Sequence, residues 1–322
     1  MKLASKVSVI IPLYDINERF FRDFIKYDLL DYPSYEILVV CDEKIILPKL
    51  KNCQVKLILT GRRNTGPAEK RDLAIKKAKG DICAFIDDDA YPDKMWLKNA
   101  VKELSMINTV AVGGPGITPD EDGYLNKLGG LVYMNFFASG RAQNRFVKLN
   151  KQFVDDWPAY NLFVRKSYLK KVGGYGTSFY GGEDTFLCLK LIHYGNITYN
   201  PNIFVYHHRR ALFLPHLKQI FNVGIHRGYF AKKFPQTSRK IFYFYPLIMT
   251  VGFIGSLIIL SIIGKFIIFV LLLIFFILLP FMYSLSYTNI TNSVLVAFGV
   301  ILTHLVYGSG FTYGLMIRKL NK

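Results

Sequence analysis

The absence of acidic residues from the last 138 positions constrains the fold of this 322-residue chain more than any other feature. All 23 Asp and Glu residues lie at or before Asp184, whereas 13 of the 41 Lys and Arg residues follow it. A segment without carboxylates that is apolar and flanked by basic residues is typical of membrane helices. The sequence therefore predicts a globular part with its carboxylates in small clusters, followed by a basic, apolar part suited to a bilayer.

Three apolar stretches follow Lys240, and Lys265 is the only charged residue between that position and Arg318. Each stretch approaches the roughly 20 apolar residues that a helix needs to cross a bilayer. The first two lack the polar face of a helix that packs on a soluble domain. We therefore expect about three transmembrane helices, at about 241–263, 266–284 and 292–315.

Basic residues are concentrated immediately before the first of these stretches. Eight of the 13 that follow Asp184 lie between Arg209 and Lys240, and such a cluster attracts anionic headgroups by about 1 kcal/mol per residue. The positive-inside rule then places the preceding domain in the cytosol of a multi-pass cell-membrane protein. Three crossings would put Arg318 on the other side, which the same rule disfavours, so the count stays open by one. The predicted domains are a cytosolic domain at 1–210, a basic amphipathic juxtamembrane segment at 211–240 and a transmembrane helical domain at 241–322. Within the juxtamembrane segment, residues 215–233 are expected to form an interfacial helix, with a helix packed on the catalytic domain as the alternative.

Two other classes of protein remain as alternatives. One is a basic membrane protein that binds polyanions, because the formal net charge is +18. Residues 1–184 contribute only +5 of that charge, so no nucleic-acid partner is expected. A transporter is the other, and it would need polar residues inside its spans, where His304 is the main candidate. The four cysteines have no metal-ligand spacing and are expected to be reduced core residues.

Apolar strands and helices alternate in the first 114 residues. Such alternation indicates an α/β fold with a mostly parallel sheet covered on both faces. Ligands of these sheets bind beyond the carboxyl ends of the strands. The expected strands are 7–14, 35–42, 55–61, 81–89 and 109–114, and the expected helices are about 16–30, 67–79 and 93–105.

Acidic residues stand at two of these strand ends, Asp42 after one and Asp87-Asp88-Asp89 after another. Three adjacent carboxylates repel one another unless a cation relieves them. An acidic triplet on an ordinary loop is more often solvated surface, but the position after an apolar strand favours a site for Mg²⁺ or Mn²⁺ that also binds a diphosphate.

A second acidic pair, Glu183-Asp184, follows Gly181-Gly182 at the start of a predicted helix. Acids in the first turn are favoured by the helix dipole alone, which is the simplest explanation. The functional explanation is a general base at the mouth of the metal site.

Four segments occur in this order along the chain: SVIIPLYD, LVVCDEK, GPAEKRDLAIKKAKGDICAFIDDDAYPDKMWL and VRKSYLKKVGGYGTSFYGGEDTFLCLKLIHYGN. Together they resemble the family 2 glycosyltransferases of the GT-A fold, a Rossmann-like nucleotide-sugar-binding domain. The resemblance covers about residues 5–210, and four motifs in family order are far more specific than any one of them. The departures are CDEK where the family usually has DDGS, and KRD where it has ARN.

The resemblance implies a role for each matching residue. Asp184 would be the general base, and Asp89 and Asp87 would hold the metal ion. Asp88 lies within the same donor-binding triplet. The remaining residues expected to bind the nucleotide sugar are Pro12 and Tyr14 in the nucleotide pocket, Asp42 at the base, Arg71 and Asp87 at the diphosphate and ribose, and His208 and Arg209 near the departing diphosphate.

The resemblance also implies the chemistry, an inverting transfer of a sugar from a nucleotide-diphosphate sugar to an acceptor hydroxyl. The acceptor is expected to be a membrane lipid or lipid-linked saccharide, as in cell-envelope glycan biosynthesis. Polyprenyl-phosphate sugar synthases are the alternative, because a phosphate acceptor needs no base. They typically have an EVPI-like strand with a following Arg and a GSK-like turn, where this chain has YNPNIFVYHHRR, so a hydroxyl acceptor is favoured.

Overall fold

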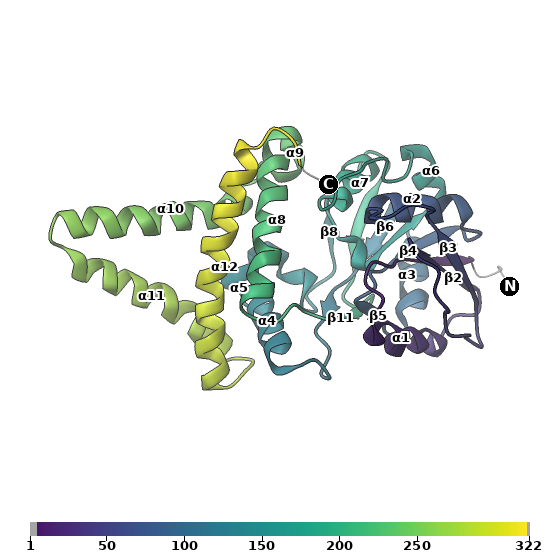
Figure 1. The fold of residues 1–322 in the computed structure, drawn as a ribbon, viewed down its shortest axis with the longest axis horizontal. Helices are drawn as coiled ribbons and strands as arrows, with labels where there is room; N and C mark the ends of the chain where they lie inside the picture. Colours follow the sequence, from purple (N-terminus) through teal and green to yellow (C-terminus); the bar gives the residue numbers. More distant parts are fainter. Residues whose placement is uncertain (1–4, 321–322) are drawn as a thin grey trace. The chain divides into compact units, whose positions relative to one another are not determined.

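The computed structural model describes residues 5–320 and divides into two compact units. The sheet unit comprises the residues up to Ile117 together with Val147–His207. The helical unit comprises Thr118–Phe146 and His208–Leu320 (Figure 1). The domain boundaries at residues 210 and 240 stay predictions. The compact units differ from the predicted domains chiefly at Thr118–Phe146. This segment belongs to the unit of the three candidate membrane helices, although it was predicted to lie in the 1–210 domain.

An eight-stranded sheet forms the centre of the sheet unit. Its strands are β1 (Val7–Pro12), β2 (Tyr35–Cys41), β3 (Gln54–Leu59), β4 (Ile82–Phe85), β6 (Thr109–Gly113), β8 (Gln152–Val154), β9 (Leu162–Arg165) and β10 (Asn196–Tyr199). The order is β3-β2-β1-β4-β9-β6-β10-β8. β9 is antiparallel to both of its neighbours and β8 is antiparallel to β10, whereas all other neighbouring strands are parallel. The predicted mostly parallel sheet is confirmed.

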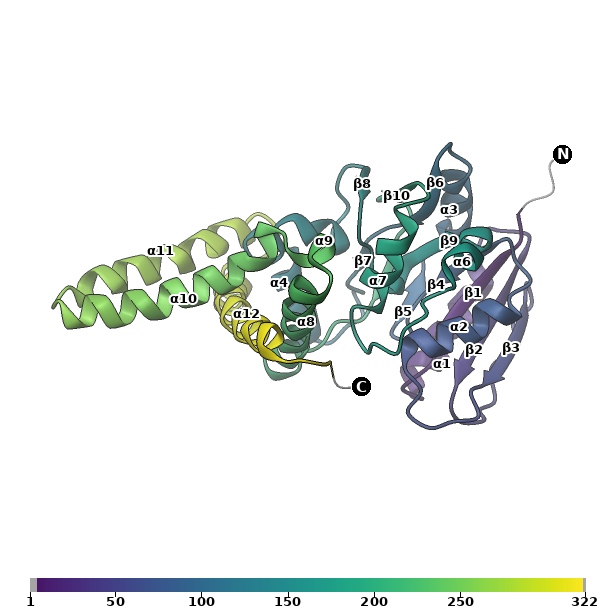
Figure 2. The same cartoon turned by 90° about the horizontal axis from the view of Figure 1, so that it is seen from above.

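Helices cover both faces of this sheet, because the strands alternate their apolar side chains between two cores. Val7, Val9 and Ile11 of β1 pack into one core, and Ile10 packs into the other. Helices α1 (Glu18–Phe24) and α3 (Trp96–Leu104) and the 3-10 turn η1 (Ile25–Leu29) contribute to the first core. Helices α2 (Pro67–Lys77), α6 (Lys166–Val172) and α7 (Glu183–Leu191) contribute to the second (Figure 2).

A second, three-stranded sheet lies in the same unit. Its strands are β5 (Ala90–Pro92), β7 (Gly116–Ile117) and β11 (Val205–His207), in the order β5-β11-β7. β11 runs antiparallel to β5, with His207 opposite Ala90. This pairing brings the end of β11 beside the acidic triplet. Elsewhere in the unit, a short 3-10 turn, η3 (Ala159–Asn161), precedes β9.

The helical unit consists of helices and one further 3-10 turn. They are α4 (Tyr124–Met134), α5 (Phe136–Ser139), η2 (Gly140–Arg145), α8 (Leu214–Lys233), α9 (Pro235–Ser238), α10 (Ile241–Ile262), α11 (Phe266–Ser284) and α12 (Ile290–Met316). Among the described residues, α10, α11 and α12 are long and apolar enough to cross a membrane. The three predicted candidate spans are confirmed to within a few residues at each end.

Glycines allow α8 and α12 to pack in close contact. A Cβ added to Gly228 would lie 2.1 Å from the carbonyl oxygen of Phe311, and one added to Gly314 would lie 2.1 Å from that of Ile225. Only glycine permits backbones to approach so closely, as in other small-residue helix interfaces. The two helices therefore form one rigid pair.

Candidate functional site

The carboxyl ends of β1 and β4 meet at one edge of the sheet. The chain continues from β1 through Tyr14 and Asp15, and from β4 into Asp87–Asp89. The backbone N–H groups of Tyr14 and Asp15 donate to Asp88 Oδ2 over 2.6 and 3.1 Å. Because parallel strands end at a common edge, residues 74 positions apart in sequence form one site.

Arg71 of α2 connects the two acidic clusters. Its side chain is 3 % exposed, and its Nη2 lies 2.6 Å from Asp87 Oδ1. Its Nη1 lies 3.0 Å from Glu183 Oε1 and 3.4 Å from Asp184 Oδ1. The planar guanidinium, with several donors in fixed directions, can hold separate carboxylates at once. The predicted proximity of Arg71 to the Asp cluster is therefore present in the geometry.

Two glycines set the direction in which α7 begins. Gly181 and Gly182 have φ values of 97° and 79°, in the left-handed region that favours glycine. Glu183, the first helical residue, then folds back so that its Oε2 accepts the backbone N–H of Gly181 over 2.9 Å. Its side chain is 7 % exposed, whereas that of Asp184 is 22 % exposed. Asp184 is therefore the more accessible of the two acids.

Asp184 is fixed from two sides. Its Oδ2 accepts the backbone N–H of Ala159 over 3.0 Å, and Arg71 lies beside its Oδ1. Burial and then the neighbouring Glu183 carboxylate raise the pKa of Asp184 above the ordinary value, against the lowering effect of Arg71. A partly exposed carboxylate with a raised pKa has the properties of a general base.

The three aspartates of the triplet point to three different partners. Asp87 binds Arg71, Asp88 accepts backbone N–H groups, and Asp89 Oδ1 lies 3.1 Å from His207 Nε2. Burial and then the charge of Asp89 raise the pKa of Asp88 to about 6. This arrangement leaves Asp89 and His207 as an adjacent carboxylate and imidazole at the strand end.

His207 is a site residue that the sequence reasoning missed. It ends β11, and its ring stacks 4.6 Å from that of Tyr160 at an angle of 37°. The available signal was strand alternation: in a strand, His207 and His208 must face opposite sides, so only one of them can face the aspartates. The strand pairing that selects His207 is not local in sequence.

His208 and Arg209, which were predicted to bind the nucleotide sugar, belong to the helical unit. His208 is 3 % exposed and its Nδ1 is paired with the Asp122 carboxylate. The Arg209 guanidinium lies 5.6 Å from the ring of Tyr133 and 5.1 Å from that of Phe146. Both side chains are thus held by contacts within the helical unit. The role of His208 and Arg209 in binding the nucleotide sugar stays a prediction.

Asp42 is held at the end of β2 by hydrogen bonds. Its Oδ1 accepts the hydroxyl of Thr60 over 2.7 Å and its Oδ2 accepts the backbone N–H of Thr65 over 3.0 Å. Burial alone would raise the pKa of Asp42, but the bonds from these two threonines and the charge of Lys70 together lower it. Asp42 is thus an ionised acceptor in a fixed position.

Tyr14 completes this side of the site. Pro12, two residues earlier, is a buried end of β1, whereas Tyr14 is 65 % exposed. The Tyr14 ring lies 6.3 Å from that of Tyr180 and 5.6 Å from Lys70 Nζ. Lys70 itself is buried and donates to the carbonyl oxygen of Leu13 over 2.7 Å. An exposed ring over a fixed cation suits a planar, anionic ligand such as a nucleotide.

The donor set fits a divalent cation. Within residues 5–320 no group of three or more His, Cys, Asp or Glu side chains could hold a metal ion by itself. Asp89 and His207 instead place one carboxylate and one imidazole 3.1 Å apart. A hard cation such as Mg²⁺ commonly takes one or two protein carboxylates and fills its other positions with water and substrate phosphates. An open pair beside Asp87 therefore suits a metal that is shared with a diphosphate.

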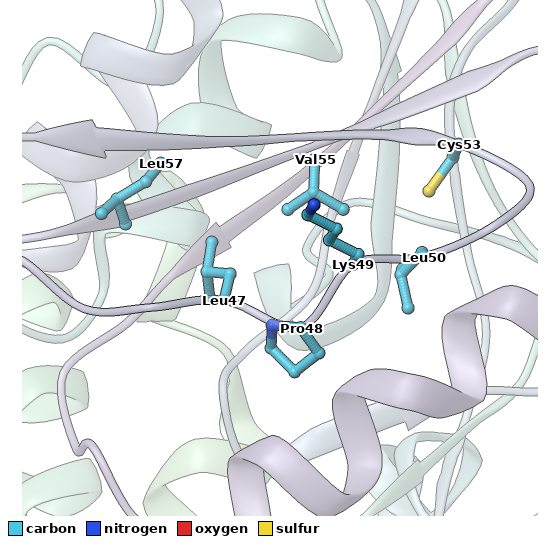
Figure 3. A pocket seen from close by; sticks show the side chains of 7 residues that line it. All are labelled: Leu47, Pro48, Lys49, Leu50, Cys53, Val55 and Leu57. Carbon is cyan, nitrogen blue, oxygen red and sulfur yellow. The ribbon is translucent and has the colours of Figure 1, made fainter.

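A cavity of about 360 Å³ lies elsewhere in the sheet unit. Figure 3 shows that its lining residues come from the segment before β3 and from the strand itself. It is open on one side, and its lining includes none of the acidic residues of the site. The lining residues are Leu47, Pro48, Lys49, Leu50, Cys53, Val55 and Leu57.

The chain is similar to known glycosyltransferases in sequence and in fold. The profile of the family described as Glycosyl transferase family 2 matches residues 8–172. The chain is 27 % identical over 161 residues to the pre-mycofactocin glycosyltransferase of Mycobacterium tuberculosis, which covers 50 % of this chain but only 33 % of that protein. The chain thus spans about a third of the length of this relative.

A second relative matches over most of both chains. It is the dolichyl N-acetyl-alpha-D-glucosaminyl phosphate 3-beta-D-2,3-diacetamido-2,3-dideoxy-beta-D-glucuronosyltransferase of Methanococcus voltae, 24 % identical over 70 % of this chain and 74 % of that protein. Among solved structures, the mannosyltransferase PcManGT of Pyrobaculum calidifontis, in complex with GDP-Man and Mn²⁺, has a TM-score of 0.51 at 19 % identity. That match covers 72 % of this chain and 65 % of the mannosyltransferase.

The family profile covers most strands of the large sheet and the acidic triplet, and it ends before α7, β10 and β11. The solved structure has a similar fold. The chain therefore belongs to glycosyl transferase family 2, and its sheet unit has the GT-A fold.

Proposed function

We propose that the protein is a membrane-anchored, inverting glycosyltransferase. It moves a sugar from a nucleotide-diphosphate sugar to a hydroxyl group of a membrane-associated acceptor, a lipid-linked saccharide. The observation that carries this proposal is the placement of a partly exposed Asp184 against the same guanidinium that holds Asp87. A base and a donor-binding carboxylate are thereby fixed on either side of Arg71.

The donor binds along the strand ends. Tyr14 and Asp42 take the nucleoside, and Arg71 lies beside the diphosphate with Asp87 at the ribose. Asp89 and His207 hold the divalent cation, Mg²⁺ or Mn²⁺, which when bound neutralises the charge of the diphosphate. The Mn²⁺ in the mannosyltransferase complex of similar fold supports a metal of this class.

The transfer is a single displacement at the anomeric carbon. The acceptor oxygen forms a bond to that carbon as the bond to the diphosphate oxygen breaks, and the nucleoside diphosphate leaves with the electron pair. Asp184 takes the proton of the attacking hydroxyl, and Arg71 stabilises the charge that develops on the diphosphate. Attack opposite the leaving group inverts the configuration of the sugar.

A hydroxyl acceptor is favoured over a phosphate one. A phosphate oxygen is already ionised near neutral pH and needs no base, whereas a sugar hydroxyl must lose its proton during attack. The name of the Methanococcus voltae relative describes transfer to a dolichyl-phosphate-linked sugar, which supports the same class of acceptor. The catalytic domain is proposed to face the cytosol, where nucleotide sugars are made and where the basic flanks of the apolar helices favour it.

The test is a comparison of Asp184→Asn with Asp31→Asn in the full chain, purified in detergent and supplied with a lipid extract as acceptor. Asp31 pairs with Lys98 on the surface, outside the site, and serves as the matched control. Labelled GDP-mannose, UDP-N-acetylglucosamine and UDP-glucose are screened as donors with Mn²⁺ or Mg²⁺. We expect Asp184→Asn to lose about 10²- to 10⁴-fold in transfer rate, the range of a general base, while donor binding by calorimetry is kept.

Unchanged transfer by Asp184→Asn would contradict the general-base role and favour the phosphate-acceptor alternative. Absence of transfer by the unaltered protein with every donor, together with tight binding of heparin, would favour the basic polyanion-binding alternative instead.

A further inference from the structure

Helices α10 and α11 form a hairpin that stands away from the rest of the helical unit. By length they measure about 33 and 28 Å, close to the roughly 30 Å of a bilayer core. The hairpin turns at Gly264 and Lys265, between the two helices. Its outer half, nearer the turn, is largely exposed: Ile258 is 53 % exposed and Leu271 is 59 % exposed.

Polar contacts between the hairpin and the rest of the helical unit lie in its base, the half of each helix that is farther from the turn. The Thr250 hydroxyl donates to the carbonyl oxygen of His304 over 3.0 Å. At the other helix, Asn135 Nδ2 donates to the carbonyl oxygen of Pro280 over 3.0 Å and Gln143 Nε2 donates to the Tyr283 hydroxyl over 2.9 Å. Tyrosines occur at this end of both helices, as they do where membrane helices leave the hydrocarbon core. They are Tyr243 and Tyr245 in α10, Tyr283 in α11 and Tyr287 just after it.

Helix α12 lies across the hairpin rather than alongside it. Figure 1 shows α12 along its length and Figure 2 shows it end-on, while the hairpin is seen lengthwise in both views. The described contacts between α10 and α12 agree: Phe244 packs 4.8 Å from Phe311, and Gly308 faces Thr250, all near the base. A third span packed in the same bundle would contact α10 along its whole length.

The helices that line α12 carry charges along its length. At its start, the Tyr124 hydroxyl of α4 donates to Asn292 over 2.8 Å. Farther along, His216 of α8 lies 2.9 Å from the Thr303 hydroxyl, and at the end Lys232 Nζ donates to the carbonyl oxygen of Leu315 over 2.8 Å. If α12 crossed the hydrocarbon core, α4 and α8 would enter it with Lys127, Lys218, Arg227 and Lys232, and such charges are costly there.

The side of α12 that its neighbours leave uncovered is nevertheless apolar. Ile290, Val294 and Phe298 recur every four residues and are 69 %, 41 % and 49 % exposed. Residues between them, such as Val296 and Val300, are buried against α4. A helix with an apolar outer stripe and polar neighbours behind it suits the boundary between headgroups and acyl chains.

The distribution of charge gives an independent indication. Among residues 241–317 only Lys265 is charged, and it lies at the hairpin turn. Lys240 precedes the hairpin, and Arg318 and Lys319 follow α12. If only α10 and α11 cross, the basic residues before and after them share one side of the membrane, as the positive-inside rule favours.

We infer that the chain crosses the bilayer twice, through α10 and α11, and that α12 lies along the membrane surface at the base of this hairpin. The partner that fits the uncovered stripe of α12 is the headgroup–acyl boundary of the bilayer. The segments before α10 and after α11 are then on the same side, and this layer of α12, α4 and α8 meets the membrane on the side where the sugar is transferred. The inference rests on the hairpin and α12, not on the proposed chemistry.

The test is protease protection of epitope tags in sealed membrane vesicles of both orientations, with the full chain. One tag precedes Met1, one follows Lys322, and one is inserted between Gly264 and Lys265. We expect the two terminal tags to be cleaved together in one vesicle orientation, and the hairpin tag to be cleaved only in the other. Detergent, which opens the vesicles, should expose all three and serves as the control.

Terminal tags on opposite sides would overturn the inference and restore three crossings. Cleavage of the hairpin tag from the same side as the terminal tags would also overturn it, because the hairpin would then dip into the bilayer without crossing. Sugar transfer is measured on the same vesicles as a separate readout. If the tags show two crossings but no donor sugar is transferred, the proposed function fails while the proposed topology stands.

Discussion

At the scale of residues, the site is organised by one buried cation. Arg71 has three carboxylate partners, Asp87, Glu183 and Asp184. A buried charge is stable only when it is paired and hydrogen-bonded, so these contacts hold Arg71 in place as much as Arg71 holds them. Arg71 alone does not balance the remaining negative charge, and this imbalance is the physical reason for proposing a divalent cation at Asp89.

Removal of the imidazole at His207 should weaken metal binding. We expect His207→Ala to raise the Mn²⁺ concentration for half-maximal donor binding at least about 10-fold, because losing even an outer partner of a metal site costs about 10- to 100-fold in affinity. Manganese titration monitored by electron paramagnetic resonance measures this directly. His193→Ala, an exposed histidine beyond α7, is the control, and equal titrations of the two variants would reduce His207 to a packing partner of Tyr160.

Much of the site could be predicted residue by residue. The Asp triplet and Asp42 stand out because charged residues directly follow apolar strands, which is a local pattern. His207 could not be chosen over His208, because the choice depends on the pairing of β11 with β5, more than 100 residues earlier. The resemblance singled out Asp184 as the base, but the difference in exposure between Glu183 and Asp184 could not be predicted, since it depends on how Gly181 and Gly182 turn the chain.

At the scale of elements, the packing of α8 against α12 sets the shape of the helical unit. The helices run in the same direction, since Gly224 faces Tyr307 and Gly228 faces Phe311 and Leu315. Sequence periodicity predicted an amphipathic helix here, and its basic residues favoured a place at the membrane interface. It could not indicate that α8 covers another helix, because a glycine stripe is not a signal in a hydrophobicity pattern.

A methyl group at this interface should destabilise the helical unit. We expect Gly228→Ala to lower the free energy of unfolding by about 1–3 kcal/mol, the usual cost of overpacking, because its Cβ would lie 2.1 Å from the Phe311 carbonyl oxygen. Thermal unfolding in detergent measures the change. Gly252→Ala on α10 has no atom within 4 Å and should be neutral or slightly stabilising; equal stabilities for both variants would refute close packing of α8 and α12.

At the scale of the whole molecule, the chain combines a sheet unit that carries the candidate site with a helical unit that carries the three candidate membrane spans. The helical unit takes in Thr118–Phe146 from the middle of the chain. Its segments reach the hairpin base through Asn135 and Gln143. Two separate stretches of sequence therefore build the layer from which the hairpin rises.

Shortening the hairpin should convert the protein from an integral to a peripheral membrane protein. Deletion of Gly252–Ile262 and Phe266–Phe276 removes about three turns from each helix and keeps the base contacts. We expect alkaline carbonate to extract this variant from membranes, while the unaltered chain resists extraction. A variant with the same positions replaced by leucine is the control and should also resist; resistance of the shortened variant would mean that α12 itself spans the bilayer.

The sequence by itself determined the mostly parallel sheet, the acidic strand ends and the three candidate spans. These follow from period, length and composition, which are local properties of a chain. It also placed the last carboxylate, Asp184, at the boundary between the acidic part and the acid-free part. Only the tertiary structure decided that β9 runs antiparallel between β4 and β6, and that Thr118–Phe146 joins the membrane helices. The tertiary structure alone also brought His207 to Asp89 and placed α12 across the hairpin. Several segments of this chain are equally apolar or equally polar, and which of them contact one another depends on packing between residues far apart in sequence.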